Sequence, residues 1–198
     1  MPNTSLILSL YKIGAIKFGH YTLKSGRSST VYLDLRQIIS YPAILSAVSE
    51  SIWQKAQDTH FNVICGVPYT ALSIATCISL QHNVPMIMRR KEKKSYGTQK
   101  QIEGVFESGQ HCLIIEDVVT TGGSILETAD DIEAVGLNIT DVVALIDREQ
   151  HGKEQLKKRG YMLHTAFTLK EILQILLHSA PLEASEQAIA ETFINEQF

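Results

Sequence analysis

Residues 113–124, which read LIIEDVVTTGGS, limit the possible folds of this chain more than any other segment. A short apolar run meets two adjacent carboxylates, Glu116 and Asp117, and is followed by two valines and a turn of threonine, glycine and serine. From Ile125 onward, apolar residues recur at the spacing of one helical face. The pattern predicts a buried strand that ends at the two acids, and then a loop that leads directly into a helix.

This loop suits an anionic ligand that also carries hydroxyl groups. Glycines let the backbone approach a ligand closely, and a helix N-terminus offers unpaired N–H groups to an anion. The two acids suit ribose hydroxyls or a hard divalent cation, so the loop points to a sugar phosphate. It lacks the residues of a Walker loop and of the dinucleotide motif, and the competing interpretation is an ordinary strand-to-helix turn with two solvated acids. The predicted ligand-binding residues are Glu116, Asp117, Val118, Val119, Thr120, Thr121, Gly122, Gly123 and Ser124.

The segment resembles the motif with which type I phosphoribosyltransferases bind phosphoribosyl pyrophosphate (PRPP). That motif is an apolar strand, two acids, two apolar residues and a loop rich in threonine and glycine. The resemblance implies an α/β fold with a central parallel sheet flanked by helices and a small N-terminal hood over the base site. It also implies a Mg²⁺ cofactor that is bound mainly through PRPP, with no metal site built from protein ligands. The motif identifies PRPP but leaves the acceptor base open.

The composition is that of one globular domain in a reducing compartment. With 198 residues, 44% of them hydrophobic, the chain is long enough for one substantial core. The formal net charge of −3 gives no reason to expect a nucleic-acid partner. The cysteines Cys65, Cys77 and Cys112 are too few for a disulfide framework, and we expect all three to be buried. Because the N-terminal apolar run is too short to cross a membrane, we expect a cytoplasmic protein with no membrane partner.

Helical and strand-like patterns alternate along the chain. Such alternation predicts a parallel sheet covered by helices on both faces, with the ligand beyond the carboxyl ends of its strands. We therefore expect the strand-end residues Gly66, Arg89, Glu116 and Asp147 to meet at one edge. The expected helices are residues 5–18, 42–57, 69–81, 122–135, 153–159 and 169–178, and the expected strands are 21–23, 31–35, 61–65, 84–88, 113–115, 141–146 and 162–166.

One domain accounts for most of the chain. Residues 1–180 are expected to form a single phosphoribosyltransferase domain, to which residues 1–40 contribute the hood. From residue 171 to the end there are five acids and no lysine or arginine. We expect residues 181–198 to be an acidic tail or a capping helix.

A run of cations, residues 89–94, follows the strand at 84–88. Five of these six residues are lysine or arginine, and a long polar loop follows them. Such a run is usually a solvated surface, but its place at the ligand edge favours a lid that neutralises pyrophosphate.

This run resembles the catalytic loop of the orotate phosphoribosyltransferase family, whose members are homodimers in which the loop closes over the neighbouring subunit's site. The resemblance implies that Arg90, Lys91 and Lys94 contact the pyrophosphate, with Lys94 as the main catalytic cation. Together with Asp117 these are the expected catalytic residues. Tyr96 is an expected substrate contact, at a position where many bacterial members carry histidine.

The segment 18–29, which reads FGHYTLKSGRSS, is the third informative stretch. By itself it fits an exposed hairpin. It resembles, however, the N-terminal signature of the same family, which implies that Lys24 reaches the ligand while Tyr32 and Leu33 line the pyrimidine. The resemblance also assigns Arg148 to the orotate, and the planar fork of arginine suits a carboxylate. Thr120 would contact the same ligand.

Residues 66–71, which read GVPYTA, match the pyrophosphate loop of that family and add Tyr69 and Thr70 to the expected site. Thr70 replaces the lysine of many bacterial members, so one cation is missing there. This loop looks closer to the transferase half of the bifunctional UMP synthase of animals, in which an orotidine-phosphate decarboxylase domain follows. We expect no such domain within these 198 residues, which leaves association with a separate decarboxylase open.

Taken with the resemblance, these motifs predict a Mg²⁺-dependent orotate phosphoribosyltransferase that makes orotidine 5′-monophosphate and pyrophosphate in UMP biosynthesis. A purine or uracil phosphoribosyltransferase would share the PRPP loop, but the Lys24 segment and the basic loop argue against it. A regulator that binds PRPP without turnover is a second rival, against which the intact basic loop argues. A role in partner binding is most plausible for the acidic tail alone.

Overall fold

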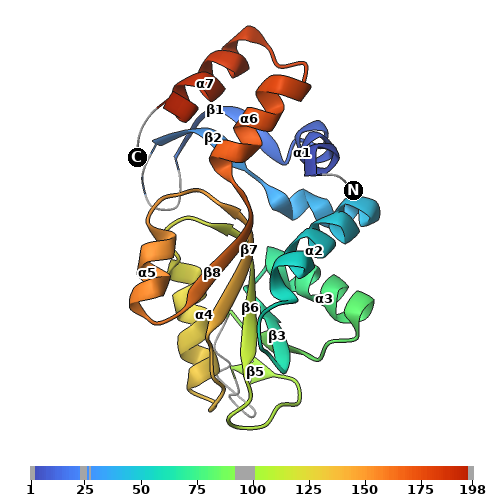
Figure 1. The fold of residues 1–198 in the computed structure, drawn as a ribbon, viewed down its shortest axis with the longest axis vertical. Coiled ribbons are helices and arrows are strands. Elements are labelled where there is room, and N and C mark those ends of the chain that lie inside the picture. The colour runs from blue at the N-terminus through green and yellow to red at the C-terminus, as the bar shows by residue number, and fades with distance from the viewer. Residues whose placement is uncertain (1–2, 23–25, 27, 92–100, 196–198) are drawn as a thin grey trace.

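The computed structural model describes residues 3–22, 26, 28–91 and 101–195 of the chain. These residues form a six-stranded sheet in the order β5-β4-β3-β6-β7-β8, with helices on both faces, and a hood at one end of it (Figure 1). The sheet is parallel except at β5, which pairs antiparallel with β4. The predicted α/β class with a central, mostly parallel sheet is therefore confirmed.

The strands of the sheet carry continuous apolar runs because both faces of the sheet are covered. In β3 every residue is buried, and in β7 every residue after the first is buried. The six strands are β3 (Val63–Gly66), β4 (Met86–Arg89), β5 (Ile102–Glu103), β6 (Cys112–Val119), β7 (Asp141–Asp147) and β8 (Met162–Thr168).

Two pairs of helices cover the two faces of the sheet (Figure 1). On one face, α2 (Pro42–Ala56) contacts β7 and β8, and α3 (Thr70–His82) contacts β3, β4 and β6. On the other face, α4 (Gly123–Glu133) contacts β4 and β6, while α5 (Gly152–Lys158) contacts β8. Because α4 starts just beyond β6, its N-terminus lies at the carboxyl edge of the sheet.

The carboxyl edge of the sheet is stepped. Strand β6 does not end at the two acids, as the sequence predicted, but continues through them to Val119. Its Ile115 pairs with Gly66, the last residue of β3, whereas Val119 pairs with Asp147, the last residue of β7. Four further residues of strand place Val119 about 13 Å beyond the level of Gly66. The step leaves room for a ligand along the side of β6 as well as at its end.

The N-terminal segment differs from the prediction. The expected helix over residues 5–18 is instead α1 (Asn3–Lys12), which gives way to the strand β1 (Ile16–Thr22). Gly14 lies between them with a φ of 72°, a backbone conformation that ends a helix readily and favours glycine. Strand β2 (Ser28–Leu33) pairs antiparallel with β1, and a 3₁₀ helix (Leu35–Ser40) that was not predicted follows it.

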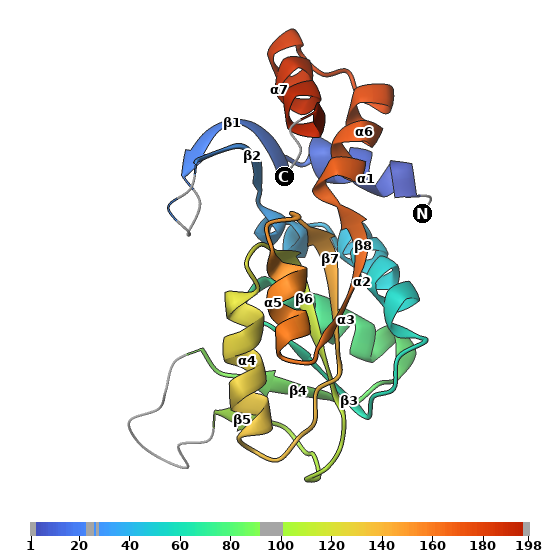
Figure 2. The same cartoon turned by 60° about the vertical axis from the view of Figure 1, so that its left-hand side comes forward.

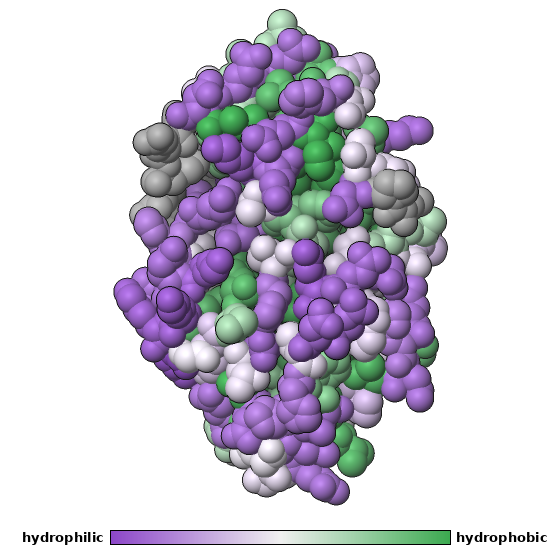
Figure 3. Space-filling model, in the orientation of Figure 1, coloured by the Kyte–Doolittle hydropathy of each residue, from purple (hydrophilic) through white to green (hydrophobic). Residues whose placement is uncertain are grey.

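The hood contains more than the N-terminal segment. Figure 2 shows the β1–β2 hairpin projecting above α4 and α5, beside α1 and the two last helices, α6 (Leu169–Ser179) and α7 (Ala184–Asn195). Helix α7 packs against α6 and β1, and its Phe193 is buried. In Figure 3, apolar side chains also reach the surface around these two helices. The hood is thus closed by the C-terminal part of the chain, in the region expected to be a tail or a capping helix.

A hydrogen bond ties α7 to α1. The hydroxyl of Tyr11 donates to Glu186 Oε2 at 2.8 Å. Burial, with the hydrogen bond and the charge of Glu186, raises the pKa of Tyr11 to about 12. The tyrosine therefore stays protonated and keeps donating this bond across the neutral range.

Strands β1 and β2 begin five and three residues earlier than predicted. From residue 41 onward the predicted boundaries agree to within two residues, apart from the extension of β6. The short strand β5 was not predicted, and α7 corresponds to the capping helix that was one of the two alternatives for residues 181–198. All three cysteines are free, but Cys77 is only half-buried, because it lies on the part of α3 that faces away from the sheet, so its predicted burial was wrong. Among the described residues, no helix combines the length and the apolar character needed to cross a membrane.

Candidate active site

The turn between β6 and α4 encloses a cavity. Gly122 caps α4 with a φ of 81°, a left-handed conformation that suits glycine, and it supplies no side-chain hydrogen bond to the N–H groups of this helix end. The first N–H groups of α4 are therefore available to an anion. The cavity has a volume of about 210 Å³ and is lined by Glu116, Val118, Val119, Thr120, Thr121, Gly122, Gly123, Ser124, Ile125 and Glu127.

The two acids of this site lie in different environments. Glu116 is 5% exposed, and its Oε1 accepts a hydrogen bond from the Asp117 N–H at 3.0 Å. Asp117 is half-buried, and its Oδ1 accepts from the Val118 N–H at 2.9 Å. Burial, and then the negative charge of Asp117, raises the pKa of Glu116 well above the usual range of a glutamate. The pair can offer a hydroxyl-bearing ligand the oxygens of two carboxyl groups that lie in different environments.

The raised pKa of Glu116 predicts a pH-dependent effect of Glu116→Gln on stability. The protonated acid favours the folded state, so its contribution is fully present below the unfolded pKa of about 4.3 and is lost as pH rises through the raised folded pKa. Glutamine does not titrate, so the variant should gain stability relative to the wild type as pH rises through this window. Urea unfolding at a series of pH values measures the difference. The exposed Glu191→Gln is the matched control, and an equal trend in both variants would contradict the assignment.

Arg148 joins the end of β7 to the hood. Its backbone N–H donates to the Val119 carbonyl at 2.9 Å, which places it beside the turn between β6 and α4 (residues 120–124), called the phosphate turn. Its Nη2 donates to Ser29 Oγ at 2.9 Å, and both Nη atoms lie 3.3 Å from the Val31 carbonyl. The residue is 2% exposed, burial lowers its pKa, and its Nε has no partner among the described residues. A buried guanidinium with an unused donor suits an anionic or carbonyl-bearing ligand.

Gly152, the first residue of α5, packs beneath the phosphate turn. A Cβ added there would lie 2.4 Å from Val119 Cγ1 and 2.7 Å from the Thr120 carbonyl oxygen. We expect Gly152→Ala to displace the turn and to weaken PRPP binding by about 10-fold, because overpacking costs about 1–3 kcal/mol. Calorimetric titration with PRPP measures the loss. Gly160→Ala is the control, since a Cβ there meets nothing within 4 Å, and equal binding by both variants would contradict this role.

The predicted pyrophosphate loop, residues 66–71, follows the end of β3 at the lower step of the sheet edge. The Val67 N–H after β3 donates to the Ile115 carbonyl at 2.9 Å, and Thr70 begins α3. Tyr69 is 58% exposed, and Lys91 Nζ lies 5.0 Å from the centre of its ring. This contact brings the start of the basic run to the predicted pyrophosphate loop.

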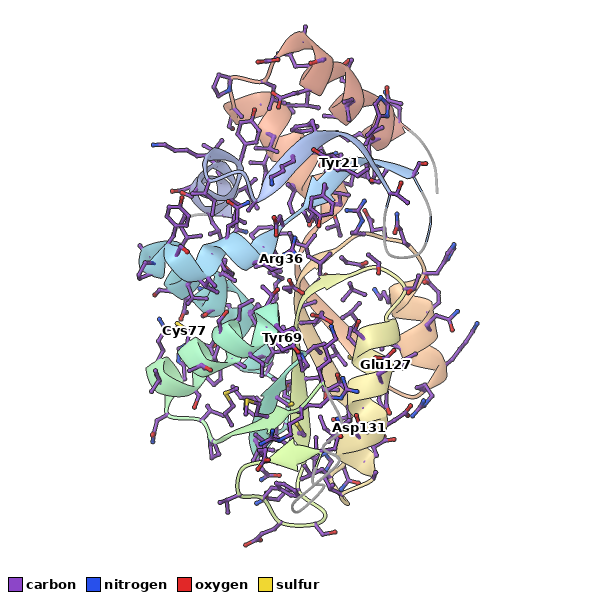
Figure 4. The ribbon with its side chains drawn as sticks, turned by 180° about the vertical axis from the view of Figure 1, so that it is seen from behind. Tyr21, Arg36, Tyr69, Cys77, Glu127 and Asp131 are labelled. Carbon is purple, nitrogen blue, oxygen red and sulfur yellow. The ribbon has the colours of Figure 1, made fainter. Side chains whose placement is uncertain are left out.

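Two arginines of the basic run are held by ion pairs. Arg89 Nε lies 2.6 Å from Asp131 Oδ2 on α4. The position of Arg89 at a strand end had led us to expect it among the ligand-binding residues, but its side chain instead joins β4 to α4. Arg90 Nε lies 2.6 Å from Glu103 Oε1 on β5. Figure 4 shows Asp131 on the same helix as Glu127, which lines the phosphate cavity. These pairs could not be predicted from the sequence, because their partners lie 42 and 13 residues further along the chain.

On the hood, Tyr32 stacks on Tyr21, with ring centres 5.0 Å apart and planes at 28°. Leu33 is half-buried beside it. Lys24, Lys94 and Tyr96, which the sequence placed in the site, lie outside the described residues. Three supporting residues were missed by the sequence analysis, namely Ser29, Asp131 and Gly152. Of these, Ser29 lay inside the quoted hood signature and could have been found there.

Comparison with known proteins gives one consistent family. Residues 34–162 match the family described as phosphoribosyl transferase domain. The chain is 48% identical over 194 residues to uridine 5′-monophosphate synthase of Bos taurus, covering 97% of this chain and 40% of that protein. It is 42% identical over 190 residues to orotate phosphoribosyltransferase of Chlamydia caviae, covering 95% of this chain and 92% of that protein.

A solved structure agrees with these relatives. The structure of Leishmania donovani UMP synthase superposes with a TM-score of 0.90 at 32% identity and covers 100% of this chain. This chain covers 43% of that one. The chain therefore spans less than half the length of the bovine and Leishmania proteins, and nearly all of the Chlamydia protein.

Proposed function

The chain belongs to the phosphoribosyl transferase domain family, and we infer that it is an orotate phosphoribosyltransferase. Its reaction transfers the phosphoribosyl group of PRPP to orotate, giving orotidine 5′-monophosphate and pyrophosphate. The observation that carries this function is the position of Arg148, which is buried between the phosphate turn and the hood. A cation at this position can bind the carboxylate of an anionic base that lies next to a sugar phosphate.

The phosphate turn and the two acids bind the ribose phosphate end of PRPP. The N–H groups and hydroxyls from Thr120 to Ser124 hold the 5′-phosphate. Glu116 and Asp117 hold the ribose hydroxyls through hydrogen bonds to their carboxyl groups. The Asp117 carboxylate also stabilises the positive charge that develops on the ribose ring as the C1–oxygen bond breaks.

Orotate lies beside Arg148, against the part of the hood that carries Tyr32 and Leu33. Tyr32 and Leu33 line the planar ring, Lys24 and Arg148 neutralise the carboxylate, and Thr120 approaches from the phosphate turn. Because bound orotate is already anionic, its ring nitrogen can attack C1 without a strong general base. Hydrogen-bond donors that are fixed before binding select this base over uncharged pyrimidines.

The pyrophosphate leaves along the lower step of the sheet edge. Lys91, next to Tyr69, together with Arg90 and Lys94, stabilises the charge on the departing oxygens. Arg90 must exchange its ion pair with Glu103 for the pyrophosphate when it takes this role. Thr70 contributes a hydroxyl where a lysine is common. The basic loop must therefore neutralise more of the negative charge of the pyrophosphate.

Mg²⁺ fits this site mainly as a partner of the substrate. Among the described residues, no three His, Cys, Asp or Glu side chains are grouped to hold a metal, whereas Asp117 and the PRPP oxygens are hard ligands that Mg²⁺ prefers. When bound, the ion neutralises part of the pyrophosphate charge.

The basic loop is proposed to act across a homodimer. Mixing Lys94→Ala subunits with Arg148→Lys subunits tests this arrangement, because one site of a mixed dimer would then carry neither change. Recovery of activity on mixing supports the loop acting on the partner's site. If the mixture of the two variants stays inactive, the loop acts on the site of its own subunit.

We assign the enzyme to UMP biosynthesis in the cytoplasm, where the free cysteines stay reduced. Association with an orotidine-phosphate decarboxylase is the proposed partnership, since the 48% identical bovine protein is a UMP synthase of which this chain covers 40%. Co-purification with that enzyme tests it. Removing residues 184–198 asks whether the tail provides the contact, and loss of orotate turnover in that variant would instead assign α7 to the fold of the hood.

Loss of orotate absorbance with PRPP and Mg²⁺ tests the function directly. Uracil, hypoxanthine and adenine are run in parallel with the same protein. Turnover of orotate alone is expected. Turnover of another base would move the protein to a different transferase, and saturable PRPP binding without any turnover would make it a regulator.

A further inference from the structure

A group of charged and aromatic side chains connects the hood to the 3₁₀ helix that follows β2. Arg36 Nε lies 2.7 Å from Asp34 Oδ1, and Arg36 Nη2 donates to the Tyr32 hydroxyl at 3.2 Å. The ring of Tyr21 also restrains Tyr32, because the two rings stack with their centres 5.0 Å apart. Tyr32 is thus held by one ring face and by its hydroxyl.

Asp34 is held in place by its backbone and by burial of its side chain. Its backbone N–H donates to the Ala15 carbonyl at 2.8 Å, and its side chain is only 15% exposed. Burial alone would raise the pKa of this carboxyl, but the hydrogen bond and the charge of Arg36 lower it below the usual range. Asp34 therefore stays ionised and keeps Arg36 oriented. Lys17 Nζ lies further away, 3.8 Å from the other carboxylate oxygen.

Arg36 is ordered although it lies at the surface. Its side chain is 68% exposed, yet two of its nitrogens are engaged by partners on the same short segment. In the view of Figure 4, Arg36 lies between Tyr21 on the hood and Tyr69 on the core. It belongs to the 3₁₀ helix (Leu35–Ser40) that leads from β2 to α2 and contacts both α2 and α3, and no sequence motif pointed to it.

We propose that Arg36 is a positioning residue that fixes Tyr32 as the wall of the base site and so sets the affinity for orotate. This inference rests on the proposed function. A tyrosine whose ring and hydroxyl are restrained before binding loses less conformational freedom when the base arrives, and that difference appears as affinity. Arg36 acts through the Tyr32 hydroxyl and touches no reacting atom. The role is specific to the base, because PRPP binds on the core.

The test is a set of single and double variants of the full chain. Arg36→Gln and Tyr32→Phe each remove the same hydrogen bond, and each is expected to raise KM for orotate about 3- to 10-fold, the range of one ordinary hydrogen bond. KM for PRPP and Tm should stay close to the wild type. The double variant should be no worse than the worse single variant, because both changes remove one interaction. Arg36→Lys keeps the charge but cannot reach both partners, so it should resemble Arg36→Gln.

Lys17→Gln is the matched control. It removes another cation beside Asp34 but leaves Tyr32 untouched, so KM for orotate should not change. Additive losses in the double variant, full recovery by Arg36→Lys, or equal changes in both KM values would each overturn the positioning role. If the wild type turns over orotate and Arg36→Gln is unchanged, only this inference fails. If the wild type does not turn over orotate, the proposed function fails first, and this inference fails with it.

Discussion

Lys94→Ala is expected to lower kcat by about 100- to 1000-fold, the loss typical of removing one group that stabilises transition-state charge. The pyrophosphate leaves with several negative charges, and Thr70 provides no cation at its own loop. The cations of the basic run must therefore neutralise more of the negative charge of the pyrophosphate. Single-turnover measurement of the chemical step with enzyme in excess isolates this effect from product release.

Lys93→Ala is the neighbouring control for Lys94→Ala. It removes the same charge from the same run, but the resemblance gives it no contact with the leaving group. We expect Lys93→Ala to keep most of the activity. A near-normal chemical step in Lys94→Ala, or equal losses in the two variants, would show that the loop acts through general charge and not through Lys94.

Arg148→Lys is expected to raise KM for orotate by about 10- to 100-fold, because hydrogen bonds to a charged group are worth about 1.5–3 kcal/mol. Lysine keeps the charge but loses the planar fork that reaches Ser29 and Val31 together. The orotate contact and the link between core and hood are then both weakened. Initial rates over a range of orotate concentrations, at saturating PRPP, measure the change.

Two comparisons identify the cause of a loss in Arg148→Lys. PRPP affinity, measured by calorimetry, should stay near the wild type, since the phosphate turn uses only the Arg148 backbone. The exposed Arg159→Lys is a matched substitution remote from the base and should leave KM unchanged. An unaltered KM for orotate in Arg148→Lys would remove Arg148 from the base site.

The proposed base site depends on contacts between distant segments. Arg148 and Ser29 are 119 residues apart in the chain, yet they form the hydrogen bond that joins the core to the hood. Helix α7 closes the hood from the other end of the sequence. Substitutions in the tail can therefore affect orotate binding without any contact between the tail and orotate.

Several elements were predictable because their signals are local. The apolar run, the acids and the glycine turn of residues 113–124 gave the strand, the loop and the helix in the right order. Where a local signal was ambiguous, the prediction failed. The helix marked by Leu6, Leu10 and Ile13 was extended past Gly14 to residue 18, so the start of β1 was predicted at residue 21 and not at residue 16. Strand β5 has only two residues, too few for any periodic pattern.

The sequence by itself determined the α/β class, the order of most elements and the phosphate turn, since each depends on residues within about one turn or strand of one another. Only the tertiary structure decided that Glu116 is buried, that Arg89 pairs with Asp131, and that the edge of the sheet is stepped. Burial and pairing depend on which distant segments pack together, and a charged residue gives no local sign of its partner. The sequence therefore indicated which residues form the proposed site, whereas the packing of the hood on the sheet determined how they are arranged.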